Sequence, residues 1–196
     1  RKPNFIGCWD IENKKLCNEI VSFFENNKEL SKEGTTTLGK NTKAKKTTDI
    51  TITPKDLEKP KFEIFKKYFK ELHNCYLDYQ KQWPFVKSIF NTIDIGVFNI
   101  QKYNPGDHFS HLHCERTSLN SLHRLFAFMT YLNDVEDGGK TNFDYYGIKV
   151  KPEIGKTLIW PAEWTHAHTG EVLKSGTKYI VTGWLHFPVK EIKENE

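Results

Sequence analysis

Long apolar stretches are missing from this 196-residue sequence, and cysteine and methionine are scarce. No apolar run approaches the roughly 20 residues of a membrane-spanning helix, which argues against a transmembrane protein. The beginning of the sequence lacks the apolar core of a signal peptide, so we expect an intracellular, cytoplasmic location and no membrane partner. The four cysteines form no CxxC pair, a pattern typical of reduced thiols rather than of a disulfide framework.

A strong excess of one charge is also missing, since the net charge is only +4. The basic residues nevertheless gather in residues 31–49, a polar segment rich in Gly and Thr and without hydrophobic periodicity. A solvated, mobile loop is the simplest interpretation, and a lid that contacts substrate is the alternative. Aromatic residues do not alternate with the lysines, so we expect no nucleic-acid partner. The lysines of this segment are Lys32, Lys40, Lys43, Lys45 and Lys46.

Aromatic side chains are abundant: they make up 14% of the residues and favour a strand-rich fold. Apolar residues at helical spacing nevertheless predict a helix over residues 11–30, capped by Asp10. A second helix is expected over residues 55–83, ended by Pro84. Between the two helices, residues 48–53 alternate in the manner of a short strand.

The pattern changes at residue 91, beyond which strand-like runs alternate with turn signals. The runs are residues 93–103, 124–135, 140–152, 155–161 and 177–187. Two helices followed by many short strands predict an α+β fold, a β-sandwich or open barrel buttressed by helices. Because neither a repeat nor a domain-scale linker is present, we expect one domain over residues 1–196. Residues 1–90 would supply helical support and the basic loop, and residues 91–190 the β-rich core.

Histidine supplies the main chemical signal, because six of the eight histidines lie between His108 and His168. His113 and Glu115 are two residues apart, so on an extended strand their side chains would point to the same face. With His168 they make two imidazoles and one carboxylate, a ligand set that holds non-haem Fe(II) and leaves the opposite positions open. Lys178 would supply a cation for an organic-acid cosubstrate.

Other metals and other histidines remain open from the residues alone. Zinc accepts the same nitrogen and oxygen donors, although the sequence has no HExxH motif. A cupin-like jelly roll would use the pair formed by His111 and His113, although its carboxylate lies further downstream than Glu115. His111 shares the expected strand face of His113, and His166 shares that of His168. The position of Glu115 two residues after His113 favours His113 as the first ligand.

Six short motifs in this half of the chain occur in a specific order. They are Tyr103–Gly106, Tyr131–Asp134, Gly138–Phe143, Pro152–Gly155, His168–Val172 and Gly176–Tyr179. Their order and spacing resemble the Fe(II)- and 2-oxoglutarate-dependent dioxygenases of the prolyl 4-hydroxylase type. The resemblance extends more weakly to residues 46–49 and to the N-terminal helix that bears Cys17.

The resemblance implies a double-stranded β-helix, or jelly-roll, core over residues 91–190, buttressed by the N-terminal helices. It also implies roles for individual residues. The iron ligands would be His113, Glu115 and His168, the last preferred to His166 because Lys178 then falls at the spacing of the family. Lys178 would bind the distal carboxylate of 2-oxoglutarate. Tyr103 would add a hydrogen bond to the cosubstrate, and Thr130 or Tyr131 would line the same pocket.

Two residues depart from the pattern of the family. The usual motif is HxD, and here Glu115 stands in place of the aspartate, one methylene longer. A carboxylate is retained, which favours hydroxylation over the halogenation of relatives that have Ala or Gly at this position. Lys140 stands where relatives often carry Glu, and we attach no mechanism to it.

The resemblance therefore implies a dioxygenase that uses Fe(II), 2-oxoglutarate and O2, with ascorbate dependence as a further expectation. It would hydroxylate an unactivated C–H bond, most simply of a prolyl residue in a peptide or protein, and release succinate and CO2. A free amino acid or small metabolite is the alternative substrate, which a deep closed pocket would favour over an open basic groove. A non-catalytic, metal-binding jelly roll that serves interaction is the alternative of a different class. The oligomeric state is not indicated by the sequence.

Overall fold

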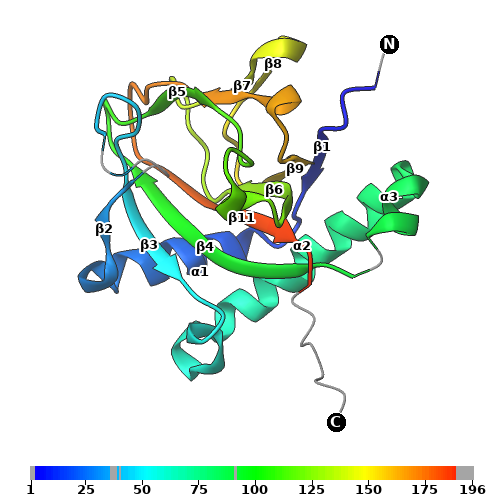
Figure 1. The fold of residues 1–196 in the computed structure, drawn as a ribbon. Coiled ribbons are helices and arrows are strands. Elements are labelled where there is room, and N and C mark those ends of the chain that lie inside the picture. Colours follow the sequence, from blue (N-terminus) through cyan, green and yellow to red (C-terminus); the bar gives the residue numbers. More distant parts are fainter. Residues whose placement is uncertain (1–2, 36–38, 40, 91, 189–196) are drawn as a thin grey trace.

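The chain folds into two antiparallel β-sheets with helices packed on the outer face of the larger one (Figure 1). The computed structural model describes residues 3–35, 39, 41–90 and 92–188. The larger sheet has the strand order β1-β9-β6-β11-β4-β3-β2, and the smaller sheet the order β5-β10-β7-β8. The strands of the larger sheet are β1 (Gly7–Asp10), β2 (Lys32–Glu33), β3 (Thr48–Ile52), β4 (Asp94–Tyr103), β6 (Arg124–Tyr131), β9 (Lys156–Pro161) and β11 (Lys178–His186). Those of the smaller sheet are β5 (Phe109–His113), β7 (Thr141–Phe143), β8 (Ile148–Val150) and β10 (His168–Gly170).

The helices are shorter than the apolar periodicity predicts. The α-helices are α1 (Lys14–Glu25), α2 (Glu63–Gln82) and α3 (Pro84–Ile89). Six 3-10 turns are η1 (Lys28–Leu30), η2 (Asp56–Glu58), η3 (Pro60–Phe62), η4 (Leu119–Ser121), η5 (Asp144–Tyr146) and η6 (Trp164–His166). Asp10 does not cap α1, because it pairs with Lys156 in the larger sheet, and the Asn13 side chain accepts the Leu16 N–H instead. Pro84 follows the end of α2 and also opens α3, where its missing N–H is not needed.

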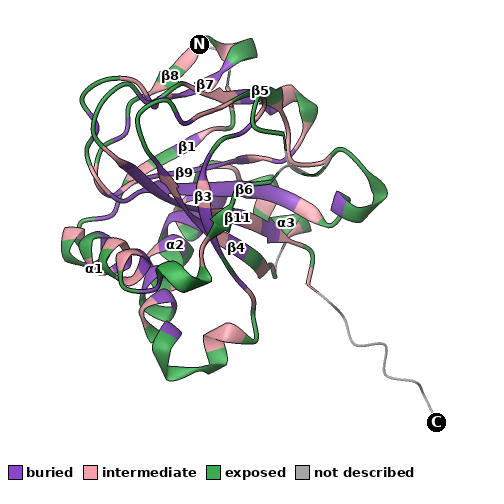
Figure 2. Cartoon of the chain, turned by 90° about the vertical axis from the view of Figure 1, so that its left-hand side faces the viewer, coloured by how far each residue is buried: buried purple, intermediate pink, exposed green. Residues whose placement is uncertain are grey.

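The central strand β6 shows how one sheet serves two cores. Its side chains alternate, so Phe126 and Phe128 face α1 and α2, whereas Ala127, Met129 and Tyr131 face the smaller sheet. Aromatic residues of α2 fill the outer core, and Figure 2 shows the buried strands between the helical layer and the smaller sheet. The larger sheet is therefore apolar on both faces, and the space between the sheets is where a cavity can form.

This arrangement is the α+β architecture with a double-stranded β-helix core that the resemblance implied. The predicted strand 140–152 is in fact β7 and β8, separated by η5 and by Gly147, whose φ of +62° allows the tight reversal. Within the described part of the chain, no helix has both the length and the apolar character needed to cross a membrane.

Candidate functional site

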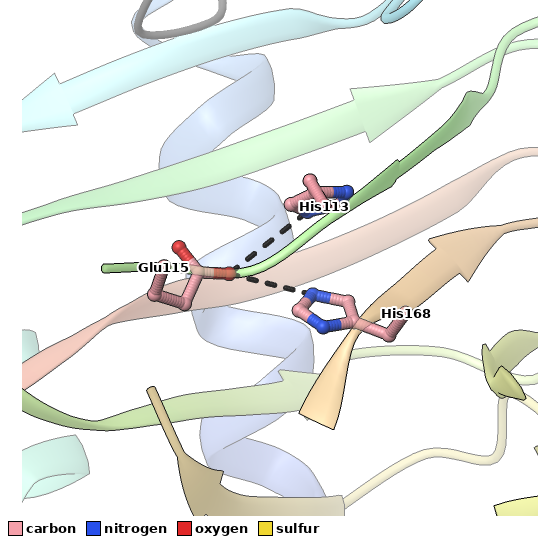
Figure 3. Close-up of side chains that lie close together, drawn as sticks. All are labelled: His113, Glu115 and His168. Carbon is pink, nitrogen blue, oxygen red and sulfur yellow. Dashed lines mark ion pairs between the residues drawn. The ribbon is translucent and has the colours of Figure 1, made fainter. Parts of the chain in front are cut away.

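The smaller sheet brings three candidate metal ligands together. His113 ends β5, His168 begins β10, and the two residues are paired across the antiparallel strands. Glu115 follows β5 by two residues, outside the strand, and its Oε1 lies 3.3 Å from His168 Nε2 and 3.9 Å from His113 Nε2. Figure 3 shows the three side chains pointing toward one another. They are the group of His, Cys, Asp or Glu side chains in the described residues that could hold a metal ion.

Each imidazole is oriented by the same backbone contact. His113 Nδ1 donates to the carbonyl of His111 at 2.8 Å, and His168 Nδ1 donates to the carbonyl of His166 at 2.9 Å. Because a carbonyl oxygen accepts only, the proton of each neutral ring lies on Nδ1 and leaves Nε2 as the ligand atom. Phe109 stacks on the His113 ring, with centroids 3.8 Å apart, and fixes its plane.

Glu115 is held from the opposite side by the larger sheet. The indole N–H of Trp184 donates to Glu115 Oε2 at 2.6 Å, and the Arg124 guanidinium donates to the backbone carbonyl of Glu115. Burial raises the pKa of Glu115, but contacts with His168, His113 and Trp184 outweigh it and hold the pKa at about 2. The carboxylate is therefore ionised, as a metal ligand must be.

Lys178 lies on the inner face of β11 and is buried, with 3% of its surface exposed. Its Nζ donates to the carbonyl of Gly139 at 2.9 Å and lies 4.0 Å from the centroid of the Tyr103 ring. No carboxylate of the described residues is within ion-pair distance of Nζ. Burial lowers the pKa of Lys178 to about 7, an effect that Glu171 partly opposes. Such an ammonium would be stabilised by an anionic ligand.

The triad and Lys178 line one cavity of about 930 Å³ between the two sheets. Lys178, Thr182 and Trp184 belong to the same face of β11, because strand residues two and four apart point the same way. Tyr145 and Trp164 also line the cavity; they are 63% and 67% exposed and contact each other edge to face. The cavity is thus enclosed by the sheets and bordered by aromatic side chains that solvent reaches.

Comparison with known proteins accounts for this arrangement. The sequence profile of the 2OG-Fe(II) oxygenase superfamily matches residues 98–186, the stretch that contains all three triad residues and Lys178. Over these residues the chain is similar to this superfamily. Its members use Fe(II), 2-oxoglutarate and O2. The curated relatives that it matches are prolyl 4-hydroxylases.

The chain is 27% identical over 92 residues to prolyl 4-hydroxylase subunit alpha-2 of Gallus gallus, a match that covers 43% of this chain and 17% of that protein. It is 29% identical over 114 residues to probable prolyl 4-hydroxylase 9 of Arabidopsis thaliana, covering 45% of this chain and 40% of that protein. The chain therefore spans less than half the length of these curated relatives.

Solved structures show the same fold at low sequence identity. A prolyl-4-hydroxylase of Pseudomonas putida superposes with a TM-score of 0.71 at 15% identity, covering 93% of this chain and 92% of that one. The viral collagen prolyl hydroxylase of Paramecium bursaria Chlorella virus-1, in complex with 2OG, gives 0.68 at 16% identity, covering 94% and 97%. A prolyl hydroxylase of Trichoplax adhaerens, in complex with a hypoxia-inducible factor peptide fragment, gives 0.67 at 14% identity, covering 92% and 83%.

The residues present fit an iron ion and a dicarboxylate. Ligands about 2.1 Å from a common metal lie about 3 Å apart when adjacent, and the ligand atoms of the triad all lie within 4.8 Å of one another. Two imidazole nitrogens and one carboxylate oxygen are the donor set of non-haem iron. Lys178, buried beside the triad without an acidic partner, fits the distal carboxylate of a dicarboxylic acid.

The two alternative histidines lie apart from the triad. His111 lines the cavity, but its side chain is exposed and is not part of the metal-ligand group. His166 was expected to share a strand face with His168, and this is wrong, because His166 belongs to the turn η6. Its Nε2 makes a hydrogen bond of 2.9 Å with the backbone carbonyl of Asn4.

The expected pocket residues of β6 divide between the two cores. Thr130 faces away from the cavity, because its hydroxyl contacts Tyr68 of α2 and Thr157. Tyr131 points toward the smaller sheet, and its hydroxyl donates to Thr141 Oγ1 at 2.6 Å. Thr141 lines the cavity and separates it from Tyr131. The prediction that Thr130 lines the pocket is therefore wrong, because side chains alternate between the two faces of strand β6.

Three residues of the cavity lining are not among those that the sequence assigns to the site: Trp184, Thr141 and Lys45. Trp184 lies at an even spacing from Lys178 on one strand, which predicts the same face. Thr141 belongs to the motif Gly138–Phe143, and its place in that motif was the feature of the sequence that could have indicated a role in the site. The basic segment was interpreted as a solvated loop, but Lys45 is buried in the cavity wall. Lys40 lies outside the described residues.

Proposed function

We propose that this oxygenase hydroxylates a prolyl residue of a peptide or protein, using Fe(II), 2-oxoglutarate and O2. The observation that carries the proposal is the triad of His113, Glu115 and His168 beside buried Lys178 in one cavity. Both relatives described above are named prolyl 4-hydroxylases, and one structural neighbour was solved with a peptide fragment. Because the chain spans only part of those relatives, their substrates extend to it only as a proposal.

The protein positions the cosubstrate through two donors. Lys178 has three N–H groups, of which one is used by Gly139, so the others can reach a carboxylate. Thr141 receives the proton of Tyr131 on its Oγ1, and its own hydroxyl proton, which points to Met129 Sδ at 4.0 Å in the ligand-free fold, can turn to an oxygen acceptor in the cavity. The two donors line the same cavity as the triad, so a dicarboxylate held there lies beside the metal ligands.

When bound, iron and 2-oxoglutarate supply the oxidation, in which O2 converts 2-oxoglutarate to succinate and CO2 and places one oxygen atom in a C–H bond of the substrate. The chain contributes geometry to this reaction. The triad would hold the metal with three ligand atoms and leave further coordination positions open to ligands. Trp160 and Ile180 line the cavity, and Phe143 packs against the His168 ring, so apolar side chains limit the access of water to the site.

The lining of the cavity favours a peptide over a free amino acid. Glu115 is the only carboxylate among the described residues that line it, and Glu115 belongs to the triad. A free amino acid would therefore find no acidic partner for its ammonium group. A residue within a peptide has no α-ammonium and no α-carboxylate, so it needs no such partner. The exposed rings of Tyr145 and Trp164 offer apolar contact to a prolyl ring at the cavity edge.

The test has two stages. Anaerobic titration with Fe(II) and then 2-oxoglutarate should give the weak visible charge-transfer band of a chelated 2-oxo acid, and His113→Ala should abolish it. Succinate release is then measured with a library of proline-containing peptides, with free L-proline as the matched comparison. Peptide-dependent succinate with a mass gain of one oxygen atom supports the proposal. A band without stimulation by any peptide, but with stimulation by free amino acids, would refute the peptide assignment. No band with metal bound would favour a non-catalytic metal-binding domain.

A further inference from the structure

The N-terminal segment contributes Lys45 to the cavity lining and holds it in a buried ion pair with Asp49, which does not itself line the cavity. Lys45 and Asp49 are 4% and 7% exposed, and Lys45 Nζ lies 2.6 Å from Asp49 Oδ2. Thr47 donates its hydroxyl to the other carboxylate oxygen at 2.6 Å. The segment is fastened to the smaller-sheet side, because Lys46 and His108 exchange backbone hydrogen bonds. The pair is therefore a fixed part of the site, with both oxygens of Asp49 engaged.

A chain of hydrogen bonds runs from this pair to the cosubstrate pocket. Gln101 Nε2 donates to Asp49 Oδ2 at 3.1 Å, and Tyr103 donates its hydroxyl to Gln101 Oε1 at 2.8 Å. Gln101 and Tyr103 are buried, line the cavity and lie two residues apart on β4. Tyr103 is paired across the sheet with Lys178, whose ammonium lies over its ring.

The chemistry of these groups fixes the direction of every proton in the chain. An ionised carboxylate only accepts, so the amide nitrogen of Gln101 must face Asp49. The amide oxygen of Gln101 must then face Tyr103, and an amide oxygen also only accepts. Tyr103 has a single hydroxyl proton, and that proton is committed to Gln101. The reverse orientation of the amide would place two acceptors, its own oxygen and the Asp49 carboxylate, in contact, which is unfavourable.

We propose that the pair of Lys45 and Asp49, acting through Gln101, makes Tyr103 an acceptor and a ring platform in the cosubstrate pocket rather than a hydrogen-bond donor to the cosubstrate. Asp49 and Gln101 are positioning residues in this account. The proposal rests on the proposed function for the identity of the ligand. It departs from the role of Tyr103 that the resemblance implied, because the hydrogen bond expected for the cosubstrate is already given to Gln101.

The neighbouring tyrosine shows the opposite polarity. Tyr131 gives its proton to Thr141, a hydroxyl that can both accept and donate. The hydrogen-bond chain that starts at Tyr131 therefore ends at a hydroxyl that can donate into the cavity. The chain that starts at Tyr103 ends at the carboxylate of Asp49, which can only accept. The donors to an anionic ligand are then Lys178 and Thr141. The ring of Tyr103 stabilises the Lys178 ammonium, which lies over its face.

A double-mutant cycle tests the proposal. The dissociation constant of 2-oxoglutarate is measured by calorimetry with Mn(II) in place of Fe(II), which avoids turnover. In the native background, Tyr103→Phe should raise this constant by less than about threefold. Gln101→Met removes the acceptor and frees the hydroxyl of Tyr103, so in that background Tyr103→Phe should cost about tenfold. A tenfold loss in the native background, or equal losses in both backgrounds, overturns the proposal.

A second measurement needs neither metal nor cosubstrate. Proton NMR of the native protein should show a slowly exchanging, downfield phenolic hydroxyl resonance that Tyr103→Phe removes and that Gln101→Met shifts upfield. A native protein without such a resonance would contradict the assigned direction of the proton. If 2-oxoglutarate does not bind to the Mn(II) protein, the proposed function fails, and the resonance still decides the direction of the hydrogen bond.

Discussion

Trp184 and Glu115 are joined by a hydrogen bond of 2.6 Å from the indole N–H to carboxylate Oε2. The bond decides which oxygen of Glu115 serves the metal, because Oε1 is left facing both imidazoles. It also joins the two sheets, since Trp184 lies on β11 and Glu115 follows β5. The longer side chain of glutamate is thus matched to a partner across the cavity.

Glu115→Asp should weaken metal binding, although aspartate is the residue usual in the family. The shorter side chain cannot keep both the indole contact and the approach of Oε1 to His168. Changes in groups that orient a ligand typically cost tenfold to a hundredfold in metal affinity, and we expect at least tenfold here. Anaerobic calorimetry with Fe(II) measures it. Glu163→Asp, in a residue paired with Arg116, is the control without effect. Equal or tighter binding by Glu115→Asp would contradict the prediction.

Trp184→Phe should reduce metal affinity while keeping an aromatic ring over Arg124, whose guanidinium carbon lies 3.7 Å from the indole centroid. The lost N–H leaves Oε2 without its donor, so the carboxylate is free to rotate. We expect a loss of about tenfold or more in the Fe(II) dissociation constant. The effect should not add to that of Glu115→Asp, because both variants break the same contact. Fully additive losses would argue that Trp184 acts by another route.

Lys178→Met should raise the dissociation constant of 2-oxoglutarate by roughly two orders of magnitude, since truncating one partner of a desolvated charge pair costs roughly 2–5 kcal/mol. Metal affinity should stay close to native, because Lys178 is not a ligand. The charge-transfer titration measures both constants. Lys174→Met removes an exposed lysine that pairs with Asp137 and is the matched control. Unchanged cosubstrate affinity would remove Lys178 from the proposed site.

The affinity for 2-oxoglutarate should fall as the pH rises above about 7. Burial lowers the pKa of Lys178 to about 7 in the ligand-free fold, whereas the carboxylate ligand requires the ammonium form. Affinity is therefore full below pH 7 and declines above it, approaching tenfold per pH unit. Calorimetry from pH 6.5 to 8.5 with Mn(II) should show proton uptake on binding. A flat profile over this range would show that Lys178 stays charged.

The same shift predicts a pH dependence of stability for the ligand-free protein. Between about pH 7 and the ordinary lysine pKa of about 10.4, the unfolded chain binds one more proton than the folded chain. The free energy of unfolding should therefore rise with pH in this window. Urea unfolding at pH 7 and pH 9 measures it, and Lys178→Met should lack this component.

Lys45→Met should destabilise the fold by about 3–5 kcal/mol, the usual cost of removing one partner of a buried ion pair. The loss arises because Asp49 keeps its charge and loses its cation. The double variant Lys45→Met with Asp49→Leu should recover part of the loss, and urea unfolding measures both. Lys43→Met, in the same segment, is the control. An effect below 1 kcal/mol would indicate that water reaches the pair.

Much of the site could be predicted because short-range geometry determines it. The spacing of two between His113 and Glu115, and the motifs that contain His168 and Lys178, indicated residues that the fold brings to one cavity. Their roles as ligands remain predictions. The architecture followed from helices that precede strands and from the resemblance of the motifs.

The remaining features depend on contacts between distant parts of the chain. Lys45 appears in a polar, basic segment, and its burial depends on Asp49 and on Gln101, which is 52 residues beyond Asp49. The start of α1 also depended on a distant partner, because Asp10 pairs with Lys156 in the sheet and leaves the helix cap to Asn13. The prediction for Thr130 was wrong because composition does not determine which face of β6 a residue occupies.

The site is divided between the two sheets: the smaller one supplies both imidazoles, and the larger one supplies Lys178, Tyr103 and the indole that holds Glu115. The distance from metal to cosubstrate anchor is therefore a distance between layers, maintained by the apolar residues packed between them. In the proposed reaction, the amount of product formed per 2-oxoglutarate consumed would then depend on how tightly the two sheets pack. Loosening that core far from any ligand would separate oxidant from substrate, so 2-oxoglutarate would be consumed without product before the protein unfolded.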